Sequence, residues 1–397
     1  MKYNFDSKIN RQENKERKND LNYLKDNYQL DDVSQVINSS IADLDFQTPD
    51  DIRKAIIHRA NQSTYSYTFV QKEFNKAIQD WYQKLHNIKI SQHWIKSGHG
   101  TVNALFQIVQ AFTNKGENVL IQTPIYGPFF RAINLSERNV IENKLVFKNQ
   151  TYEIDFKDFE NKIIENNVKL FLFCNPHNPG GVVWSQEQVQ EIIRICQKHK
   201  VLIVSDEVHG DLVLNDLTHQ SLLKYKVTNN NFIICNSPNK AFNLGGLKGS
   251  YLIIADEEIK RRLDQQFEKN STTSPNIFFQ PALISAYNSV QVFKWLKELK
   301  EYVYENYLFL KKELSVLENV EVMKMQASYL VWIKYDSNLL SFETFNKLLK
   351  ENNLIVGMGA EFGSGNDWFR INIGLSRQKL QELTNRLVNI LKIKKEK

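Results

Sequence analysis

Short apolar runs alternate with amphipathic helical patterns from about residue 50 to residue 255. The runs are apolar at consecutive rather than alternate positions, so they predict strands whose two faces are both buried. Such strands are typical of a mostly parallel sheet with helices on both sides. The runs in question are "NVLIQTP", "VKLFLFCNP", "VLIVSDEV", "NFIICNSP" and "SYLIIAD". Between two of them, Ser185 and Gln188 predict a capping box that opens a helix ending near His199.

The pattern changes from about Pro275 onwards, where long charged helices precede the strand patterns "SYLVWIKY" and "WFRINIG". This predicts a smaller α+β domain that the N-terminal segment completes. At 397 residues the chain exceeds the size at which one core usually stops growing, so two domains sharing a cleft are expected. We expect the large domain at 48–285 and the small domain at 1–47 and 286–397.

Composition narrows the class of protein further. Hydrophobic residues make up 42% of the chain and charged residues 24%, which is ordinary for a globular protein. The 51 basic and 45 acidic residues are scattered along the chain, which argues against a nucleic-acid partner. No segment approaches the roughly 18 apolar residues of a membrane span, and the N-terminus has no apolar stretch typical of a signal peptide.

The three cysteines, Cys174, Cys196 and Cys235, lie inside or beside apolar runs and lack metal-ligand spacing. We interpret them as small core residues of a protein from a reducing compartment. The expectation is a cytoplasmic protein with no metal ion, no membrane and no nucleic acid.

Polar residues follow the apolar runs, at the sheet edge where open parallel sheets bind ligands. Gly100 and Thr101 open a helix whose free N–H groups favour an anion, although simple capping explains this pair alone. Tyr126 stands between two prolines, where its ring could stack on a ligand or fill the core.

In "NPHNPGG", prolines stiffen and glycines bend the backbone around Asn178, an arrangement that aims one amide side chain. The alternative is an ordinary Pro-Gly turn that contains an Asn.

Charged residues follow the next two runs. Asp206 ends a buried strand and needs a cationic partner, because an unpaired buried carboxylate is costly. His209 lies three residues later, where a structural role is at least as common as a catalytic one. Lys240 follows Ser237 in an apolar, Gly-rich stretch, and Lys248 is a second cation nearby. Desolvation and that neighbouring charge favour a neutral, nucleophilic amine, although either lysine alone could be a surface residue.

The ordered motifs "NPHNPGG", "SDEVH" and "SPNKAF" resemble the fold type I family of pyridoxal-phosphate (PLP) enzymes, the aspartate aminotransferase superfamily. Within it, "IADLDFQTP", "YSYT", "TPIYGPF", "KAFNLGGLKGS" and "WFRINIG" resemble the cystathionine β-lyase (C-S lyase) branch of the MalY/PatB type. The resemblance runs from about residue 40 to the C-terminus. It implies a PLP-transferase fold, with a mostly parallel seven-stranded sheet sandwiched by helices in the large domain and a smaller α+β domain.

The resemblance also implies roles for these residues. Lys240 would hold PLP covalently and, once substrate has released it, act as the base on the substrate Cα. Asp206 would pair with the pyridinium nitrogen, Asn178 would hydrogen-bond the phenolic oxygen, and Tyr126 would stack on the ring. His209 would support the phenolic oxygen.

For the cofactor phosphate, the resemblance implies Gly100, Thr101, Ser237 and Lys248. Tyr67 would reach it from a neighbouring subunit, which implies an obligate homodimer with shared active sites.

Arg370 would bind the α-carboxylate of a small amino-acid substrate, and Asn178 and Tyr126 would also contact that substrate. The N-terminal stretch departs from this branch, because it lacks the Lys-Trp pair expected near its start.

The function that the resemblance implies is PLP-dependent α,β-elimination on L-cystathionine or related L-cysteine S-conjugates, giving a thiol, pyruvate and ammonia. An aminotransferase with the same site residues is an open alternative. A PLP-binding regulator that acts through protein contacts is a second alternative.

Overall fold

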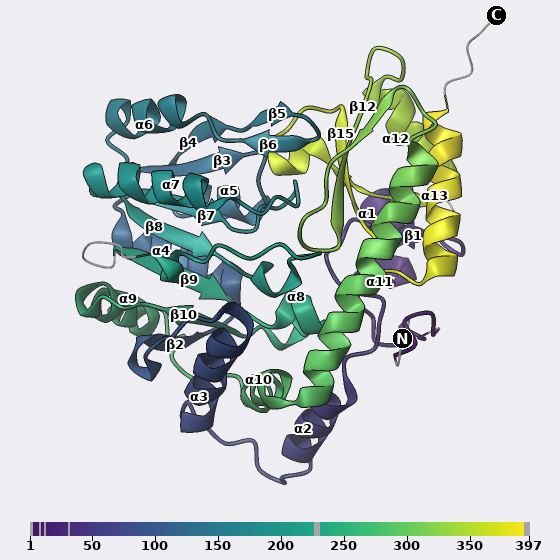
Figure 1. Cartoon of the computed structure of the whole chain (residues 1–397). Helices are drawn as coiled ribbons and strands as arrows, with labels where there is room; N and C mark the ends of the chain where they lie inside the picture. Colours follow the sequence, from purple (N-terminus) through teal and green to yellow (C-terminus); the bar gives the residue numbers. More distant parts are fainter. Residues whose placement is uncertain (1–2, 8, 12, 31, 226–230, 393–397) are drawn as a thin grey trace, which may run out of the picture.

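The computed structural model describes residues 3–7, 9–11, 13–30, 32–225 and 231–392. Within these residues a seven-stranded sheet has the strand order β2-β10-β9-β8-β7-β3-β4 (Figure 1). Its strands are β2 (Ile95–Gly98), β3 (Asn118–Thr123), β4 (Asn139–Lys144), β7 (Leu170–Cys174), β8 (Leu202–Asp206), β9 (Phe232–Asn236) and β10 (Ser250–Ile253). Only β10 is antiparallel to its neighbours; the other pairs are parallel. The mostly parallel seven-stranded sheet is confirmed.

Side chains alternate between the two faces of this sheet, as strand geometry requires. In β7, Leu170 and Leu172 pack on one side while Phe171 and Phe173 pack on the other. The first side is covered by α4 (Thr101–Phe112), α5 (Pro128–Asn134) and α9 (Glu257–Lys269). The second side is covered by α3 (Lys72–Trp81), α6 (Phe156–Glu165), α7 (Gln186–Lys198) and α10 (Phe279–Asn288). Apolar runs without alternation are therefore the sequence signature of this double burial.

Two local features bear on the sequence predictions. The Ser185–Gln188 capping box at the start of α7 is present, with both reciprocal hydrogen bonds. Strand β4 lies at the sheet edge and pairs only with β3. Only two of the six residues of its sequence, "NVIENK", are apolar, so it lacks the unbroken apolar run that marks the inner strands.

A second, antiparallel sheet of four strands has the order β11-β12-β15-β14. Its strands are β11 (Val320–Val322), β12 (Leu330–Tyr335), β14 (Gly357–Met358) and β15 (Trp368–Asn372). Three helices belong to this part of the chain: α11 (Val290–Leu314), α12 (Phe342–Glu351) and α13 (Arg377–Leu391). The long charged helix expected from the sequence is α11.

The N-terminal segment joins this second sheet region. Strand β1 (Ile37–Asn38) pairs in parallel with β13 (Leu354–Ile355), and α1 (Leu21–Tyr28) packs beside them. Helix α2 (Asp50–Ala60) leads from there towards α10 and the large sheet. The domain limits 48–285 and 1–47 with 286–397 stay a prediction; the limit at 285/286 falls inside α10.

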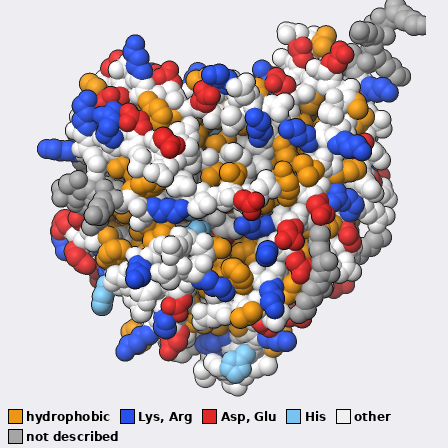
Figure 2. All heavy atoms as spheres, viewed as in Figure 1, with side chains coloured by type: hydrophobic (Ala, Val, Ile, Leu, Met, Phe, Trp, Pro, Cys, Tyr) orange, Lys and Arg blue, Asp and Glu red, His pale blue; other side chains and the backbone are white. Residues whose placement is uncertain are grey.

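Several surface and core features complete the description. On the face shown in Figure 2, basic and acidic side chains are interspersed. Cys174, Cys196 and Cys235 are free thiols buried in the core, as the sequence predicts. In the part of the chain that the structure describes, no helix combines the length and apolar character needed to cross a membrane.

Asn306 connects α11 to the chain after β15, and this contact yields a prediction about stability. Its fully buried amide donates hydrogen bonds to the carbonyl oxygens of Ile373 and Leu375, both at 2.9 Å. Asn306→Leu leaves both buried carbonyls without a donor, so we expect a loss of about 3 kcal/mol in the free energy of unfolding, measured by urea denaturation. Glu301→Ala, at an exposed position of the same helix, is the control and should change stability by less than about 0.5 kcal/mol. Equal stability of the two variants would contradict this account of α11.

Candidate active site

The predicted site residues converge where the inner strands of the large sheet end. Asn178 follows β7, Asp206 ends β8 and Lys240 follows β9, and these three strands are neighbours in the sheet. Arg370 reaches the same place from β15 of the second sheet, because its guanidinium bonds the Asn178 side chain. The site therefore lies between the two sheets, as expected for a shared cleft.

Asp206 is a buried carboxylate at the last position of β8, with 5% of its surface exposed. The Val208 N–H donates to it at 3.2 Å, and among the described residues no basic side chain forms an ion pair with it. Burial raises the pKa of Asp206 to about 6, while the Val208 hydrogen bond and the nearby Lys240 charge act in the opposite direction. This carboxylate still needs the cationic partner that the sequence implies.

Lys240 lies on the short helix α8 (Asn239–Phe242), and its Nζ donates a hydrogen bond to the Ala42 carbonyl oxygen at 2.7 Å. Burial, followed by the positive charge of Arg370, lowers the pKa of Lys240 to about 8. Asp43 and Asp206 partly offset that shift. Near neutral pH the amine is therefore far more often neutral, and nucleophilic, than an ordinary lysine.

Arg370 is a buried guanidinium with 4% of its surface exposed. It donates to Asn178 Oδ1 at 3.0 Å and to the Ser40 carbonyl oxygen at 2.7 Å, while its Nε has no partner among the described residues. Burial lowers the pKa of Arg370 to about 10, so the group stays cationic at neutral pH. A buried cation with an unused N–H suits a planar carboxylate ligand.

Asn178 and Tyr126 stand beside these charges. Arg370 occupies the Asn178 oxygen, so its amide N–H₂ is the part left for a ligand. Tyr126 is half-buried, and burial raises the pKa of its hydroxyl, which also lies within the influence of Arg370 and Asp206. His209 is 3% exposed, and its Nδ1 lacks a partner among the described residues. Burial, then the Lys240 charge, lowers the pKa of His209 to about 3, so it is neutral.

The residues predicted for an anion meet at the start of α4. Gly100 has φ +93° and precedes Thr101, the first residue of that helix. A Cβ on Gly100 would lie 3.7 Å from the Lys248 carbonyl oxygen, so the helix start and the Lys248 backbone pack side by side. The Ser237 hydroxyl donates to the Gly249 carbonyl oxygen at 2.8 Å, so it would have to rotate before donating to an anion. The Lys248 side chain is exposed.

Tyr67 is the predicted site residue that the structure does not bring to this cluster. Its side chain is 95% exposed and lies in the irregular stretch between α2 and α3. The same stretch exposes Tyr65 and Phe69, at 60% and 94%.

Sequence reasoning missed several groups that belong to the site. The carbonyl oxygens of Ser40 and Ala42 accept hydrogen bonds from Arg370 and Lys240. Tyr329, 1% exposed, also donates to the Ala42 oxygen at 3.2 Å. Backbone acceptors leave no residue-type signal; the one indication was the motif "IADLDF", which contains Ala42 and directly follows Ser40.

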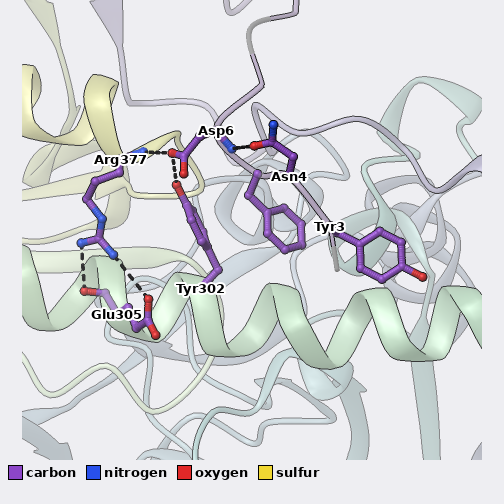
Figure 3. Close-up of a pocket in the computed structure, with 7 residues that line it drawn as sticks. Tyr3, Asn4, Asp6, Tyr302, Glu305 and Arg377 are labelled. Carbon is purple, nitrogen blue, oxygen red and sulfur yellow. Dashed lines mark hydrogen bonds and ion pairs between the residues drawn. The ribbon is translucent and has the colours of Figure 1, made fainter. Parts of the chain in front are cut away.

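Two surface cavities lie elsewhere on the molecule. One of about 290 Å³, shown in Figure 3, is lined by Tyr3, Asn4, Phe5, Asp6, Tyr302, Glu305 and Arg377. The other, of about 390 Å³, lies around Arg138. No predicted site residue lines either cavity, so neither belongs to the cluster described above.

The chain is similar to known proteins over most of its length. The family model for aminotransferase class I and II matches residues 34–387. Cystathionine beta-lyase PatB from Bacillus subtilis (strain 168) is 33% identical over 362 residues, covering 89% of this chain and 92% of that protein. Cystalysin from Treponema denticola, solved with a pyridoxal 5'-phosphate cofactor, has a TM-score of 0.92 and 29% identity, covering 98% of this chain and 99% of that one. A PLP-bound C-S lyase from Staphylococcus hominis, in complex with L-cycloserine, has a TM-score of 0.90 and 28% identity, covering 99% of both chains.

The raised pKa of Asp206 makes the stability of the ligand-free protein depend on pH. The Asp206 carboxyl titrates near pH 4 in the unfolded chain and near pH 6 in the folded protein. The free energy of unfolding therefore falls as the pH rises between these values, because the buried carboxyl resists ionisation. Two pKa units correspond to about 3 kcal/mol. We expect ligand-free Asp206→Asn to be more stable than wild type at pH 8, with a difference that vanishes towards pH 4. Thermal unfolding followed from pH 4 to pH 8 checks this, and a variant that is less stable than wild type at pH 8 would contradict it.

Proposed function

Because the chain belongs to the aminotransferase class I and II family, we propose that it is a PLP-dependent carbon–sulfur β-lyase acting on L-cystathionine or related L-cysteine S-conjugates. Its cofactor is pyridoxal 5'-phosphate, as the family and the PLP-bound structures similar to it establish. The lyase reaction and the substrate class are the proposed part.

The residues of the site fit this cofactor. Asp206 is a buried carboxylate that forms no ion pair with any described residue, which suits a protonated pyridine nitrogen. Lys240 offers an amine with a pKa near 8, and the first turn of α4, from Thr101, offers backbone N–H groups for a phosphate. The Gly100 N–H itself donates to the Ser250 hydroxyl oxygen at 3.1 Å. When bound, PLP supplies the electron sink that makes the substrate Cα–H bond acidic.

Each side chain of the site would then have its own role in the reaction, set by its position. Arg370 and the Asn178 amide bind the α-carboxylate and orient the Cα–H bond, while the half-buried Tyr126 excludes water from one side. Lys240, whose lowered pKa makes the neutral amine more available near pH 7 than that of an ordinary lysine, takes the Cα proton. The negative charge of Asp206 keeps its partner nitrogen protonated. Burial and charge at the site support each of these proposed roles.

The proposed reaction consumes one L-cysteine S-conjugate and one water. The Cα–H and Cβ–S bonds break, the thiol leaves, and the remaining three-carbon unit is hydrolysed to pyruvate and ammonia. The lyase assignment is carried by the 33% identity to a cystathionine β-lyase over most of both chains. The same side chains would also serve an aminotransferase, so the residue types alone do not separate the two reactions.

We also propose that the chain acts as a homodimer. The strongly exposed aromatic side chains of Tyr65, Tyr67 and Phe69 support this, because apolar surface gathered on one segment is typical of an interface. In that dimer Tyr67 would reach the phosphate site of the partner subunit. The cytoplasmic location stays a prediction.

Thiol release without a keto acid tests the lyase proposal directly. We expect the purified protein, loaded with PLP and given L-cystathionine alone, to release equimolar homocysteine and pyruvate through many turnovers. A thiol reagent and lactate dehydrogenase coupling measure the two products. Amino-group exchange with an added keto acid, without thiol release, would establish the aminotransferase instead.

Tyr67 provides the test of the shared site. Tyr67→Phe removes one hydrogen bond to a charged phosphate, which corresponds to about ten- to a hundredfold weaker PLP binding. Tyr65→Phe is the matched control, because the Tyr65 hydroxyl donates only to the nearby Ala60 carbonyl oxygen and should leave PLP affinity unchanged. PLP affinity is measured by fluorescence titration and the assembly by analytical ultracentrifugation. A monomer with full PLP affinity would refute the proposed dimer.

A further inference from the structure

The segment 39–45, "SSIADLD", lies between the two cationic groups of the site. On one side it contacts α8, the helix of Lys240. The Asn243 side chain, at the C-terminal cap of α8, accepts from the Leu44 N–H at 3.2 Å and donates to the Leu44 carbonyl oxygen at 3.0 Å. The Ala42 carbonyl oxygen accepts from the Lys240 amine itself.

On its other side the segment contacts β15, the strand of Arg370. The Asn372 side chain donates to the Ile41 and Asp43 carbonyl oxygens at 2.7 and 2.5 Å. Ser39 exchanges backbone and side-chain hydrogen bonds with Asn372, and the Ser40 carbonyl oxygen accepts from Arg370. The position of this segment therefore decides how far apart Lys240 and Arg370 are held.

What holds the segment is a group of charges around the buried Lys18. The Lys18 side chain is fully buried, and its ammonium meets Asp45 Oδ1 at 2.8 Å, the Asp43 carbonyl oxygen at 2.9 Å and Asp43 Oδ1 at 3.3 Å. Arg11 adds contacts to Asp45 at 2.7 Å, to Asp43 at 3.4 Å and to the Leu44 carbonyl oxygen at 3.0 Å. A fully buried lysine is rare and costly unless its charge is paired, and Lys18 is in ion-pair contact with both Asp43 and Asp45 and donates a hydrogen bond to the Asp43 carbonyl oxygen.

We propose that Lys18, assisted by Arg11, is a positioning residue for the active site: through Asp43 and Asp45 it fixes the segment 39–45 and thereby the places of the catalytic amine and the carboxylate-binding guanidinium. This inference rests on the proposed roles of Lys240 and Arg370. It gives the N-terminal segment a function although it touches neither group.

Charge as well as position connects Lys18 to the amine. The charged groups that act on Lys240 are Arg370 and Lys248, which lower its pKa, and Asp43 and Asp206, which raise it. Lys18 and Arg11 partly neutralise Asp43 on its other side. Removing Lys18 should therefore leave the Asp43 charge less neutralised and raise the proton affinity of the Lys240 nitrogen. Removing the Asp43 charge should lower that proton affinity.

The N-terminal segment has a second attachment, which keeps a Lys18 variant from releasing the whole segment. Figure 3 shows Asp6 accepting hydrogen bonds from the Tyr302 hydroxyl at 2.6 Å and from the Arg377 backbone N–H at 2.7 Å. The Phe5 ring packs against those of Phe46, Trp295 and Tyr302, at centroid distances of 5.1 to 5.6 Å. Except for Phe46, which directly follows the segment 39–45, the partners in these contacts lie on α11 and α13.

The test compares Lys18→Met with a matched control, Lys379→Met. Lys379 also pairs with Asp45, at 2.8 Å, but it is partly exposed and contacts neither Asp43 nor the rest of the segment. Each PLP-loaded full-length protein is titrated by pH while the visible absorbance of the bound cofactor is recorded, and kcat and KM are measured separately. Far-UV circular dichroism and thermal melts confirm that each variant is folded.

For Lys18→Met we expect the spectral transition to move up by about half a pH unit to one unit, and kcat/KM to fall about tenfold or more. For Lys379→Met we expect no spectral shift and less than about a threefold change in kcat/KM. Asp43→Asn keeps the shape of the side chain and removes its charge, so its spectral transition should move down. This second variant carries the test if Lys18→Met does not fold.

Two results would overturn the inference: a folded Lys18→Met that matches Lys379→Met in both readouts, or an Asp43→Asn variant whose spectral transition does not move down. Failure of the proposed function looks different, since the wild-type protein would then show no visible cofactor band or release no thiol. A wild type that works beside unresponsive variants refutes the role of Lys18 alone.

Discussion

Three charged groups, Asp206, Lys240 and Arg370, are held in one largely buried site without pairing with one another, and this constraint governs the rest of the structure. Unpaired buried charges are costly, and an anion and two cations would ordinarily collapse into ion pairs. Here each is held apart by neutral backbone or amide partners: Val208, Ala42 and Asn178. The protein therefore keeps three separate charges ready for a ligand that carries the complementary ones, and that ligand relieves the cost.

The chain builds this arrangement from distant parts of its sequence. The anion ends a strand in the middle of the large sheet, the amine lies on a helix of four residues, and the guanidinium lies in the second sheet. The segment 39–45 joins the last two, and Lys18 with Arg11 anchors that segment. Residues within the first fifty positions thus set the geometry of groups two hundred and more positions away.

The sequence predicted those features that are visible as particular types of residue at particular positions. Strand β7, Leu170–Cys174, follows from its unbroken apolar run, because burial on both faces leaves no polar positions. Asp206 and Asn178 were found because a polar residue directly after such a run needs an explanation. Strand β4 was missed, since an edge strand with one paired side tolerates polar residues.

Other features left no readable signal. The Ser40 and Ala42 carbonyl oxygens are backbone groups, so the residue types at these positions do not indicate their role. Lys18 stands in a strongly polar stretch that resembles a solvated surface, and only tertiary contacts reveal that it is buried. The proposed action of Tyr67 lies in a second copy of the chain. The central claim, that the Lys240 amine anchors the cofactor, is tested most directly by reducing the PLP-loaded protein with borohydride and mapping the modified peptide by mass spectrometry. The account predicts a pyridoxyl group on Lys240; modification of Lys248 instead, or of no lysine, would contradict it.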